Sequence, residues 1–273
     1  MSDRYGLKTI KTELVDDVLV VTLNRPERRN ALNPEMHLEL HQLYEAVIHD
    51  DEPNAMVLTG EGKYFCVGAD FADMESNLDA GGYPDGHPGL LVESVGMARN
   101  ILAVRIPMVA AINGDAIGIG ATISLFCDIV YMAETARIAD PHVKGGMVAG
   151  DGGAVLWPLL MGPNRAKEFL MTGDLVSAQE ADRLGLVNHV VPTDEVFDQA
   201  MAMAKRLAAG PAVATRLNKR LVNKDLETRV AALYDLSVAF EAISMETADH
   251  REAVQSFLEK RPPTFRSGKV GGT

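Results

Sequence analysis

The chain has 273 residues, which is enough for one large domain or two small ones around a substantial buried core. Its formal net charge of −12 excludes nucleic acids and anionic membranes as general partners, because the long-range electrostatic force on them is repulsive. Two cysteines without zinc-type spacing exclude a disulfide framework and a structural metal site, and the lack of a signal-like or membrane-length apolar run predicts a cytoplasmic protein.

Predicted strands and helices alternate in the first two thirds of the chain. β-Branched and apolar runs predict strands at 18–23, 55–59 and 108–112. Asn33-Pro34 starts a helix with apolar residues at helical spacing, and a second amphipathic helix is predicted at 91–104. This alternation indicates an α/β core.

Two loops in this region suggest contact with a ligand. Arg28 and Arg29 precede the first helix, where they can either pair with phosphates or remain solvated. Residues 74–89 are rich in glycine, proline and acids, which indicates a long surface loop. Such loops often border a substrate, so we expect this one to influence substrate choice.

The segment 113–128, NGDAIGIGATISLFCD, places a glycine-rich turn directly before an uncharged helix. A helix start offers unpaired backbone N–H groups and the positive end of the helix dipole, which can bind an anion or an oxyanion formed during a reaction. A second interpretation is open, because Gly118 and Gly120 also suit a close-packed strand–helix junction. Ile123 stands where a dinucleotide-binding fingerprint needs a third glycine, so no nicotinamide cofactor is expected.

The rest of the chain adds two short strands, a second glycine-rich turn and a helical region. The strands are predicted at 128–132 and 137–139, and the turn at 145–153 carries Asp151 ahead of an apolar helix, where an acid can act as a cap. A capping box and a glycine stop delimit one of the later helices. Helices are predicted at 163–171, 177–184, 194–208, 211–223, 227–246 and 249–260.

Five blocks of sequence, in order along the chain, resemble the enoyl-CoA hydratase/isomerase, or crotonase, superfamily. The blocks are NRPERRNALN, VLTGEGKYFCVGADF, AAINGDAIGIGATISLFCDIVYMAE, LMTGDLVSAQEADRLGLVNHVV and SFLEKRPPTF. The resemblance implies a single domain with an α/β crotonase (ClpP-like) fold. It consists of a spiral of ββα units over 1–195, a helical oligomerisation region over 196–260 and a tail over 261–273. Homotrimers or dimers of trimers are implied as well.

The resemblance also gives the glycine loops a shared role. In this family, one backbone N–H from each of two loops binds the thioester carbonyl of an acyl-CoA and stabilises the enolate that forms from it. By position, these donors are Ala69 and Ile119. Prearranged donors of this kind contribute about 3 to 4 kcal/mol each to transition-state stabilisation. Because the donor is a backbone group, Ile119 in place of the usual glycine keeps the N–H, although its side chain can narrow the hole.

Coenzyme A is implied as part of the substrate, and neither a separate cofactor nor a metal is expected. The arginines of PERRN match positions near its phosphates, and the residues after Gly68 line its adenine and pantetheine side. Two further positions lie on the closing C-terminal helix, three residues apart and therefore on one face. The implied contacts are Arg28, Arg29, Ala69, Asp70, Phe71, Ala72, Phe257 and Lys260.

The chain departs from the family pattern at the catalytic positions. Hydratases of the family use two glutamates as general acid and base, and the matching positions here hold Thr122 and His142. Threonine cannot act as a base near neutral pH, although it can orient water, whereas histidine titrates in the useful range. Efficient two-glutamate hydration is therefore not expected. His142 and Asp151 become the catalytic candidates, since a carboxylate beside an imidazole fixes its tautomer and raises its basicity.

Three functions stay open. The leading one is an acyl-CoA enzyme of the enoyl-CoA hydratase/isomerase type. The segment 149–165 also resembles the superfamily's β-diketone hydrolases, which cleave carbon–carbon bonds by a retro-Claisen route and carry an aspartate there. In the third, a non-catalytic acyl-CoA-binding protein, His142 is a packed strand-end residue and Asp151 a helix cap.

Overall fold

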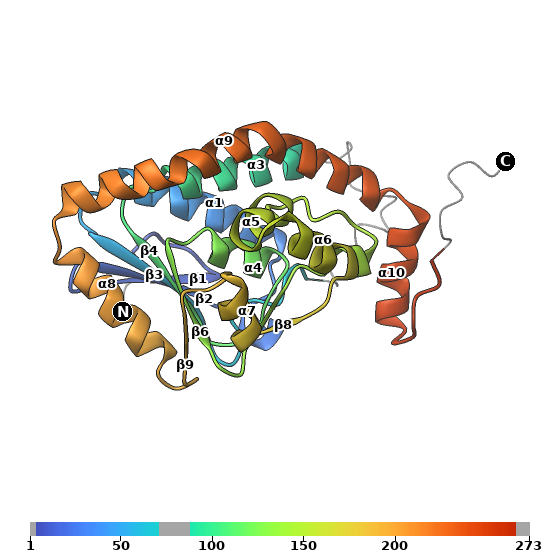
Figure 1. Cartoon of the computed structure of the whole chain (residues 1–273), viewed down its shortest axis with the longest axis horizontal. Helices are drawn as coiled ribbons and strands as arrows, with labels where there is room; N and C mark the ends of the chain where they lie inside the picture. The colour runs from blue at the N-terminus through green and yellow to red at the C-terminus, as the bar shows by residue number, and fades with distance from the viewer. Residues whose placement is uncertain (1–3, 71–87, 266–273) are drawn as a thin grey trace.

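The computed structural model describes residues 4–70 and 88–265, with side chains described for 4–70 and 96–265. Two sheets form its centre (Figure 1). The larger has the strand order β1 (Ile10–Val15), β2 (Val18–Leu23), β3 (Ala55–Gly60), β4 (Met108–Ile112), β6 (Ile129–Ala133) and β9 (His189–Val191). β1 pairs antiparallel with β2, and the other neighbours are parallel. The smaller sheet contains β5 (Ala116–Ile117), β7 (Arg137–Ala139) and β8 (Val176–Ser177).

Helices cover the larger sheet and extend beyond it. α8 (Val196–Ala208) packs against β2, β3, β4 and β6, while α9 (Ala212–Met245) runs along α3 (Pro88–Ala103) and α5 (Gly153–Met161) at the top of Figure 1. Every residue of β3 and β4 is buried, as expected for parallel strands covered on both faces. The remaining helices are α1 (Pro34–His49), α4 (Ile119–Leu125), α6 (Pro163–Thr172), α7 (Ala178–Leu184), α10 (Ala248–Leu258) and the 3₁₀ turns η1 (Pro26–Arg28) and η2 (His142–Gly145).

A ββα pattern repeats along the core. Each turn supplies a strand to the larger sheet, then a strand to the smaller sheet, then a helix, as in β4, β5, α4 and again in β6, β7, α5. Isolated bridges from Leu32 to Ala69 and from Cys66 to Ala116 extend this pattern to the two earlier turns, which follow β2 and β3. The expected α/β class with repeated ββα units is therefore confirmed.

Most predicted elements lie where the sequence placed them. The strand at 18–23 is confirmed residue for residue, and the helix after Asn33 begins with the Asn33 side chain accepting from the Met36 N–H. Ser177 caps α7 by accepting from the Glu180 N–H, and Gly185 ends that helix in the left-handed conformation. β1 is not predicted, because its exposed Lys11 and Glu13 interrupt its apolar character at the sheet edge.

The prediction of separate helices at 211–223 and 227–246 is wrong, because α9 is one continuous helix of 34 residues. Its sequence contains neither glycine nor proline between Ala212 and Met245. Polar residues around 223–227 favour helix well enough to propagate it, and burial of Val230, Tyr234 and Val238 anchors the second half.

The expected shared helix face of Phe257 and Lys260 is also wrong. α10 ends at Leu258, and Lys260 has a left-handed backbone conformation with φ 54°. Phe71, Ala72 and most of the loop predicted at 74–89 lie outside the described residues, whereas Pro88 and Gly89 belong to α3. Among the residues described, no helix is long and apolar enough to span a membrane.

Candidate active site

The glycine turn after β4 packs against the loop that follows β3. The Asn113 side chain joins them: its amide donates to the carbonyls of Gly60 and Gly62, and its oxygen accepts from the Gly60 N–H. A Cβ at Gly120 would lie 2.4 Å from the carbonyl oxygen of Cys66, so only glycine permits this approach. The close-packing interpretation is therefore correct for Gly120, and the group that approaches is the other loop.

The same packing brings the two expected oxyanion donors into one region. If Gly118, where φ is +56°, carried a Cβ atom, that atom would lie 3.8 Å from the Cα of Gly68. Gly68 is the residue before Ala69, so the two loops are in contact here. The Leu32 N–H donates to the Gly68 carbonyl, and the Leu32 carbonyl accepts from the Asp70 N–H. Because backbone groups alternate along an extended chain, the N–H of Ala69 faces away from Leu32. Ile119 is the first residue of α4, whose N–H has no intrahelical acceptor.

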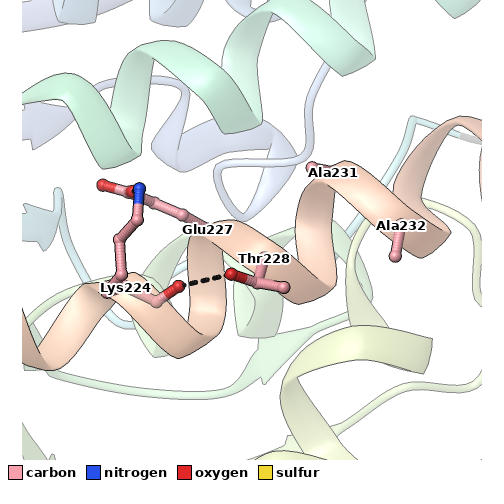
Figure 2. A pocket seen from close by; sticks show the side chains of 5 residues that line it. All are labelled: Lys224, Glu227, Thr228, Ala231 and Ala232. Carbon is pink, nitrogen blue, oxygen red and sulfur yellow. Dashed lines mark hydrogen bonds and ion pairs between the residues drawn. The ribbon is translucent and has the colours of Figure 1, made fainter.

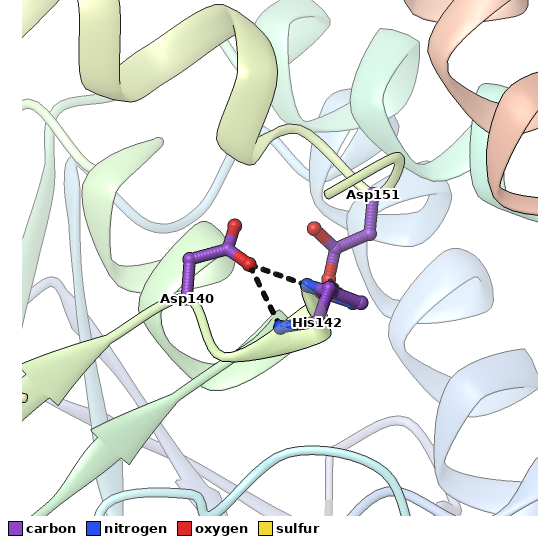
Figure 3. Close-up of side chains that lie close together, drawn as sticks. All are labelled: Asp140, His142 and Asp151. Atoms are coloured by element: carbon purple, nitrogen blue, oxygen red, sulfur yellow. Dashed lines mark hydrogen bonds and ion pairs between the residues drawn. The ribbon is translucent and has the colours of Figure 1, made fainter. Parts of the chain in front are cut away.

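His142 lies beside this region, at the start of η2. Its Nδ1 is 2.5 Å from Oδ1 of Asp140, the residue that follows β7 (Figure 3). If Gly118 carried a Cβ atom, that atom would lie 3.8 Å from Cε1 of His142, so the imidazole ring lies beside Gly118. The side chain of Asp140 is fully buried, whereas that of His142 keeps 11% of its surface exposed. Asp140 thus fixes the imidazole, and Nε2 is left facing the other acids of the site.

Asp151 reaches the opposite ring nitrogen. Its Oδ2 is 3.7 Å from Nε2 of His142, and its Oδ1 accepts a hydrogen bond of 3.1 Å from the hydroxyl of Thr122. The expected proximity of His142 and Asp151 is confirmed, but the close hydrogen-bond partner of the imidazole is Asp140. Thr122 has no exposed surface, so its hydroxyl orients Asp151 instead of holding a water molecule at an open position. Gly152 is the N-cap residue of α5 and offers no side-chain cap, whereas the backbone N–H of Gly153, the first residue of α5, lies close enough to the Asp151 carboxylate to oppose the rise of its pKa.

A third carboxyl group, which the sequence pattern does not predict, is that of Glu241 on α9. Its Oε1 is 3.6 Å from Nε2 of His142, and its side chain is 14% exposed. Glu241 belongs to a polar stripe at helical spacing, which contacts the loop around Asp151. In that stripe, Tyr234 donates to the Asp151 carbonyl, Ser237 donates to the Gly150 carbonyl, and Ser244 accepts from the Val148 N–H. The spacing 234, 237, 241 and 244 is the sequence signal that marks this buried polar face.

The electrostatics of the cluster follow from its burial and its excess of acids. Burial opposes protonation of His142, but the negative charges of Asp140, Asp151 and Glu241 outweigh it and hold the pKa of His142 well above 6.5. Burial raises the pKa of Asp151, and the neighbouring Asp140 adds to the effect. Burial, together with Asp151 and Asp140, raises the pKa of Glu241 to about 8. The group therefore holds protons near neutral pH and titrates as a unit.

The cluster has spare ligand capacity. Within the described part of the chain, Oδ2 of Asp140 and Oδ2 of Asp151 are buried without a hydrogen-bond partner. Asp140, His142 and Asp151 also offer atoms within 4.8 Å of one another, a grouping that could hold a metal ion. Coordination through Nδ1 of His142 would have to replace the short hydrogen bond to Asp140.

The residues expected to contact coenzyme A are more exposed. Arg28 and Arg29 lie on the surface, with the Arg29 guanidinium 5.4 Å from the centre of the Tyr64 ring. Phe257 is 58% exposed and Lys260 is exposed as well. The carboxylate of Asp70 is bound by Arg25 at 3.1 Å, which ties the loop that carries Ala69 to the start of η1.

A separate hollow lies on α9, far along the helix from Glu241. Figure 2 shows its lining, which comes from that helix alone: Lys224, Glu227, Thr228, Ala231 and Ala232. Lys224 and Glu227 form an ion pair of 2.8 Å within it. Since one helix cannot enclose a ligand and the charged groups neutralise each other, this hollow is a weaker candidate site than the His142 cluster.

Comparison with known proteins agrees with the fold. The family described as Enoyl-CoA hydratase/isomerase matches residues 13–268. A putative enoyl-CoA hydratase of Thermus thermophilus is 38% identical, with 91% of this chain and 97% of the relative covered, and a 1,2-epoxyphenylacetyl-CoA isomerase of Escherichia coli is 34% identical, with 95% and 98% covered. A crotonyl-CoA hydratase of Syntrophomonas wolfei is also 34% identical, with 95% and 98% covered.

Solved structures lead to the same assignment. The crystal structure of an enoyl-CoA hydratase/isomerase from Mycobacterium paratuberculosis superimposes with a TM-score of 0.87 at 37% identity, covering 92% of this chain and 100% of that one. The two sheets and long C-terminal helices are therefore those of the crotonase fold. The chain belongs to the enoyl-CoA hydratase/isomerase family and is an acyl-CoA enzyme of that type.

Proposed function

We propose that this enzyme binds the thioester carbonyl of an acyl-CoA between the N–H groups of Ala69 and Ile119 and forms the enolate by proton transfer to His142. The observation that carries the proposal is the position of the imidazole. It lies beside Gly118, the residue before Ile119, and its Nδ1 is bound to Asp140. A base held next to an oxyanion donor is the arrangement that enolate formation requires.

The proposed reaction step uses these groups in order. Asp140 accepts from Nδ1–H, which leaves the lone pair on Nε2 of His142 as the base. The bond between the α-carbon and its hydrogen breaks, the proton passes to Nε2, and the electron pair moves to the thioester oxygen. The family resemblance assigns an acid of the reaction to the position of Thr122, and the structure brings Asp151 to the same site. Thr122 itself cannot exchange a proton near neutral pH. Weak hydration of simple enoyl-CoAs is therefore expected.

The test is the exchange of α-protons in deuterated water, measured across several acyl-CoAs. Wild-type protein should catalyse exchange, and His142→Ala should lower its rate at least 100-fold, while binding of coenzyme A is unchanged. A fast hydration of crotonyl-CoA that is undiminished in His142→Ala would contradict the mechanism. Tight binding of coenzyme A without any exchange would instead support the non-catalytic function.

The binding of coenzyme A is part of the same proposal. We assign its phosphates to Arg28 and Arg29, its adenine and pantetheine to Ala69 through Ala72, and its closing contacts to Phe257 and Lys260. The exposure of the arginines, of Phe257 and of Lys260 supports this assignment, because a ligand can reach all of them. Charge reversal at Arg28 and Arg29 together should weaken coenzyme A binding without altering the fold.

Assembly and location complete the proposal. We infer a homotrimer or a dimer of trimers, in the cytoplasm, with residues 196–260 as the contact region of a single domain whose core is 1–195. Support comes from large apolar side chains exposed along α9 and α10, among them Val213, Leu217, Leu221, Leu236, Phe240, Ile243 and Phe257. Sedimentation should give three or six times the chain mass of 29.5 kDa, and the mass of one chain would contradict the inference.

A β-diketone hydrolase is the second candidate. The observation that favours it is the contact of one imidazole with both Asp140 and Asp151, since such a histidine can also activate a water molecule for attack on a ketone. Turnover of cyclic and linear β-diketones, without exchange of acyl-CoA α-protons, would favour hydrolysis. Binding of coenzyme A with no diketone turnover would count against it.

A further inference from the structure

Glu241 lies in the candidate site, but the sequence pattern does not predict it there and the proposed reaction step gives it no role. It comes from α9, 99 residues after His142, and yet its Oε1 lies 3.6 Å from Nε2. Its placement is tight, because a Cβ at Gly150 would lie 2.4 Å from its Oε2. His142, Asp151 and Glu241 keep between 11% and 14% of their side-chain surface exposed, whereas Asp140 keeps none. These three groups can therefore meet a substrate, and Asp140 cannot.

The two acids near Nε2 of His142, Asp151 and Glu241, differ in their hydrogen-bond partners. An imidazole has at most one hydrogen on that nitrogen, so it can serve only one of two carboxylates. Asp151 has a further donor in the Thr122 hydroxyl. For Glu241, the one positively charged partner seen in the described part of the chain is His142, and the other charged groups that act on its carboxyl group, Asp151 and Asp140, are acids. A buried carboxylate without a donor is unfavourable, whereas the protonated acid needs only an acceptor. Burial and the nearby acids accordingly raise the pKa of Glu241 to about 8.

We propose that Glu241 is the second proton-transfer group of this site, which donates a proton to the enolate carbon while His142 is the group that accepts one from the substrate. The proposal rests on the function proposed above and assigns an unsaturated acyl-CoA as the substrate class, with movement of its double bond as the reaction. Nε2 of His142 and Glu241 share one proton, and the reactive form is the one in which that proton lies on Glu241 and Nε2 is free, whereas the acids around His142 favour the form with the proton on Nε2.

The steps balance without any further reactant. His142 takes the α-proton, and the C–H electron pair enters the enolate, which the conjugated double bond extends to the γ-carbon. The carboxyl group of Glu241 then gives its proton to the γ-carbon, where a C–H bond forms, and the double bond settles between the α- and β-carbons. The proton on Nε2 passes across the 3.6 Å gap to the Glu241 carboxylate, which restores the starting state. Two groups with separated roles replace the pair of glutamates that the chain lacks at 122 and 142.

The test compares two rates in one set of variants. Glu241→Gln keeps the size and packing of the side chain but cannot donate the proton. It should lower the conversion of a β,γ-unsaturated acyl-CoA at least 100-fold, and by a much larger factor than it lowers α-proton exchange, because His142 performs the exchange step. Glu241→Asp, which retains the acid, should recover part of the conversion. Glu227→Gln, which removes a carboxylate from an exposed ion pair on the same helix, is the matched control and should change neither rate.

The outcomes distinguish failure of this inference from failure of the proposed function. Absence of exchange in the wild-type protein would remove the proposed function and this inference with it. Unchanged conversion in Glu241→Gln, with exchange intact, would overturn the role of Glu241 alone. An equal loss of exchange and conversion in Glu241→Gln would also overturn it, because Glu241 would then only hold His142 in place.

Discussion

The hydrogen-bond partner of the His142 imidazole is a different residue from the one that the sequence predicts. Asp151, carried by the second glycine turn, is the predicted carboxylate partner of His142, and it approaches Nε2 at 3.7 Å. The closer contact comes from Asp140, only two residues before His142 and separated from it by a proline. The turn at Pro141 brings the carboxylate back to Nδ1. Such a short Asp-Pro-His segment has no distinctive spacing, so its geometry becomes visible only in three dimensions.

Substitution of Asp140 by asparagine should impair the site through His142. The change removes the charge that favours the imidazolium and the acceptor that fixes the Nδ1 tautomer. The pKa of His142 should fall, as followed by NMR titration of its imidazole, and α-proton exchange should decrease at least 100-fold. Asp174→Asn, which removes an exposed partner of Lys144, is the control. An unaltered histidine titration together with an unaltered rate would contradict the role of Asp140.

At the scale of elements, the sequence predicts the core better than the C-terminal region. Apolar runs such as 108–112 identify buried strands, because both faces of the parallel sheet are covered. Glycines identify the loops at 68 and 118, although the structure shows that part of their purpose is to let the loops touch. In contrast, exposed polar residues near the middle of α9 resemble a break between two helices. Nothing local indicates that the second half docks on the loop around Asp151.

Proline at position 225 tests the continuity of α9. In a continuous helix, Asp225→Pro removes a backbone hydrogen bond and introduces a clash, which should lower the free energy of unfolding by about 3 kcal/mol or more. A loop at 224–226 would tolerate it at little cost. Asp225→Ala is the control, because it removes the exposed ion pair with Arg229 but retains the N–H. Urea denaturation of both variants gives the comparison, and equal stabilities would argue for two helices.

For the whole molecule, the site depends on contacts that span most of the chain. Gly118, His142, Asp151 and Glu241 belong to two core turns and to the long helix α9, and the Tyr234 and Ser237 hydroxyls fix the loop between them. Pattern reading locates each element but cannot determine which side chains meet across 99 residues. The resemblance to a family predicts that the loops at Ala69 and Ile119 supply oxyanion donors. It could not supply Glu241, because the family positions considered for acids were 122 and 142.

This shared cluster should make the stability of the whole molecule fall as the pH rises from about 5 to 8. The pKa of Glu241 is raised from 4.5 to about 8, so the folded protein keeps a proton that the unfolded chain releases above pH 4.5. Asp151 acts in the same direction. His142, with its raised pKa, contributes stability that is fully present below pH 6.5 and is lost as the pH rises through its folded value. Each such proton changes the free energy of unfolding by up to about 1.4 kcal/mol per pH unit.

Urea denaturation between pH 5 and 8 measures this slope, and Glu241→Gln should make it shallower, whereas Glu227→Gln should not. Two ion pairs elsewhere in the molecule do not obscure the result. The pKa values of Asp50 and Glu252 are lowered to about 2 by their arginine partners, so the stability that they contribute is lost only in more acidic solution. A stability that is flat or increases from pH 5 to 8 would show that the acids around His142 are already ionised in the folded protein. Glu241 would then have no proton to donate, and the acid role assigned to it would fail together with this prediction.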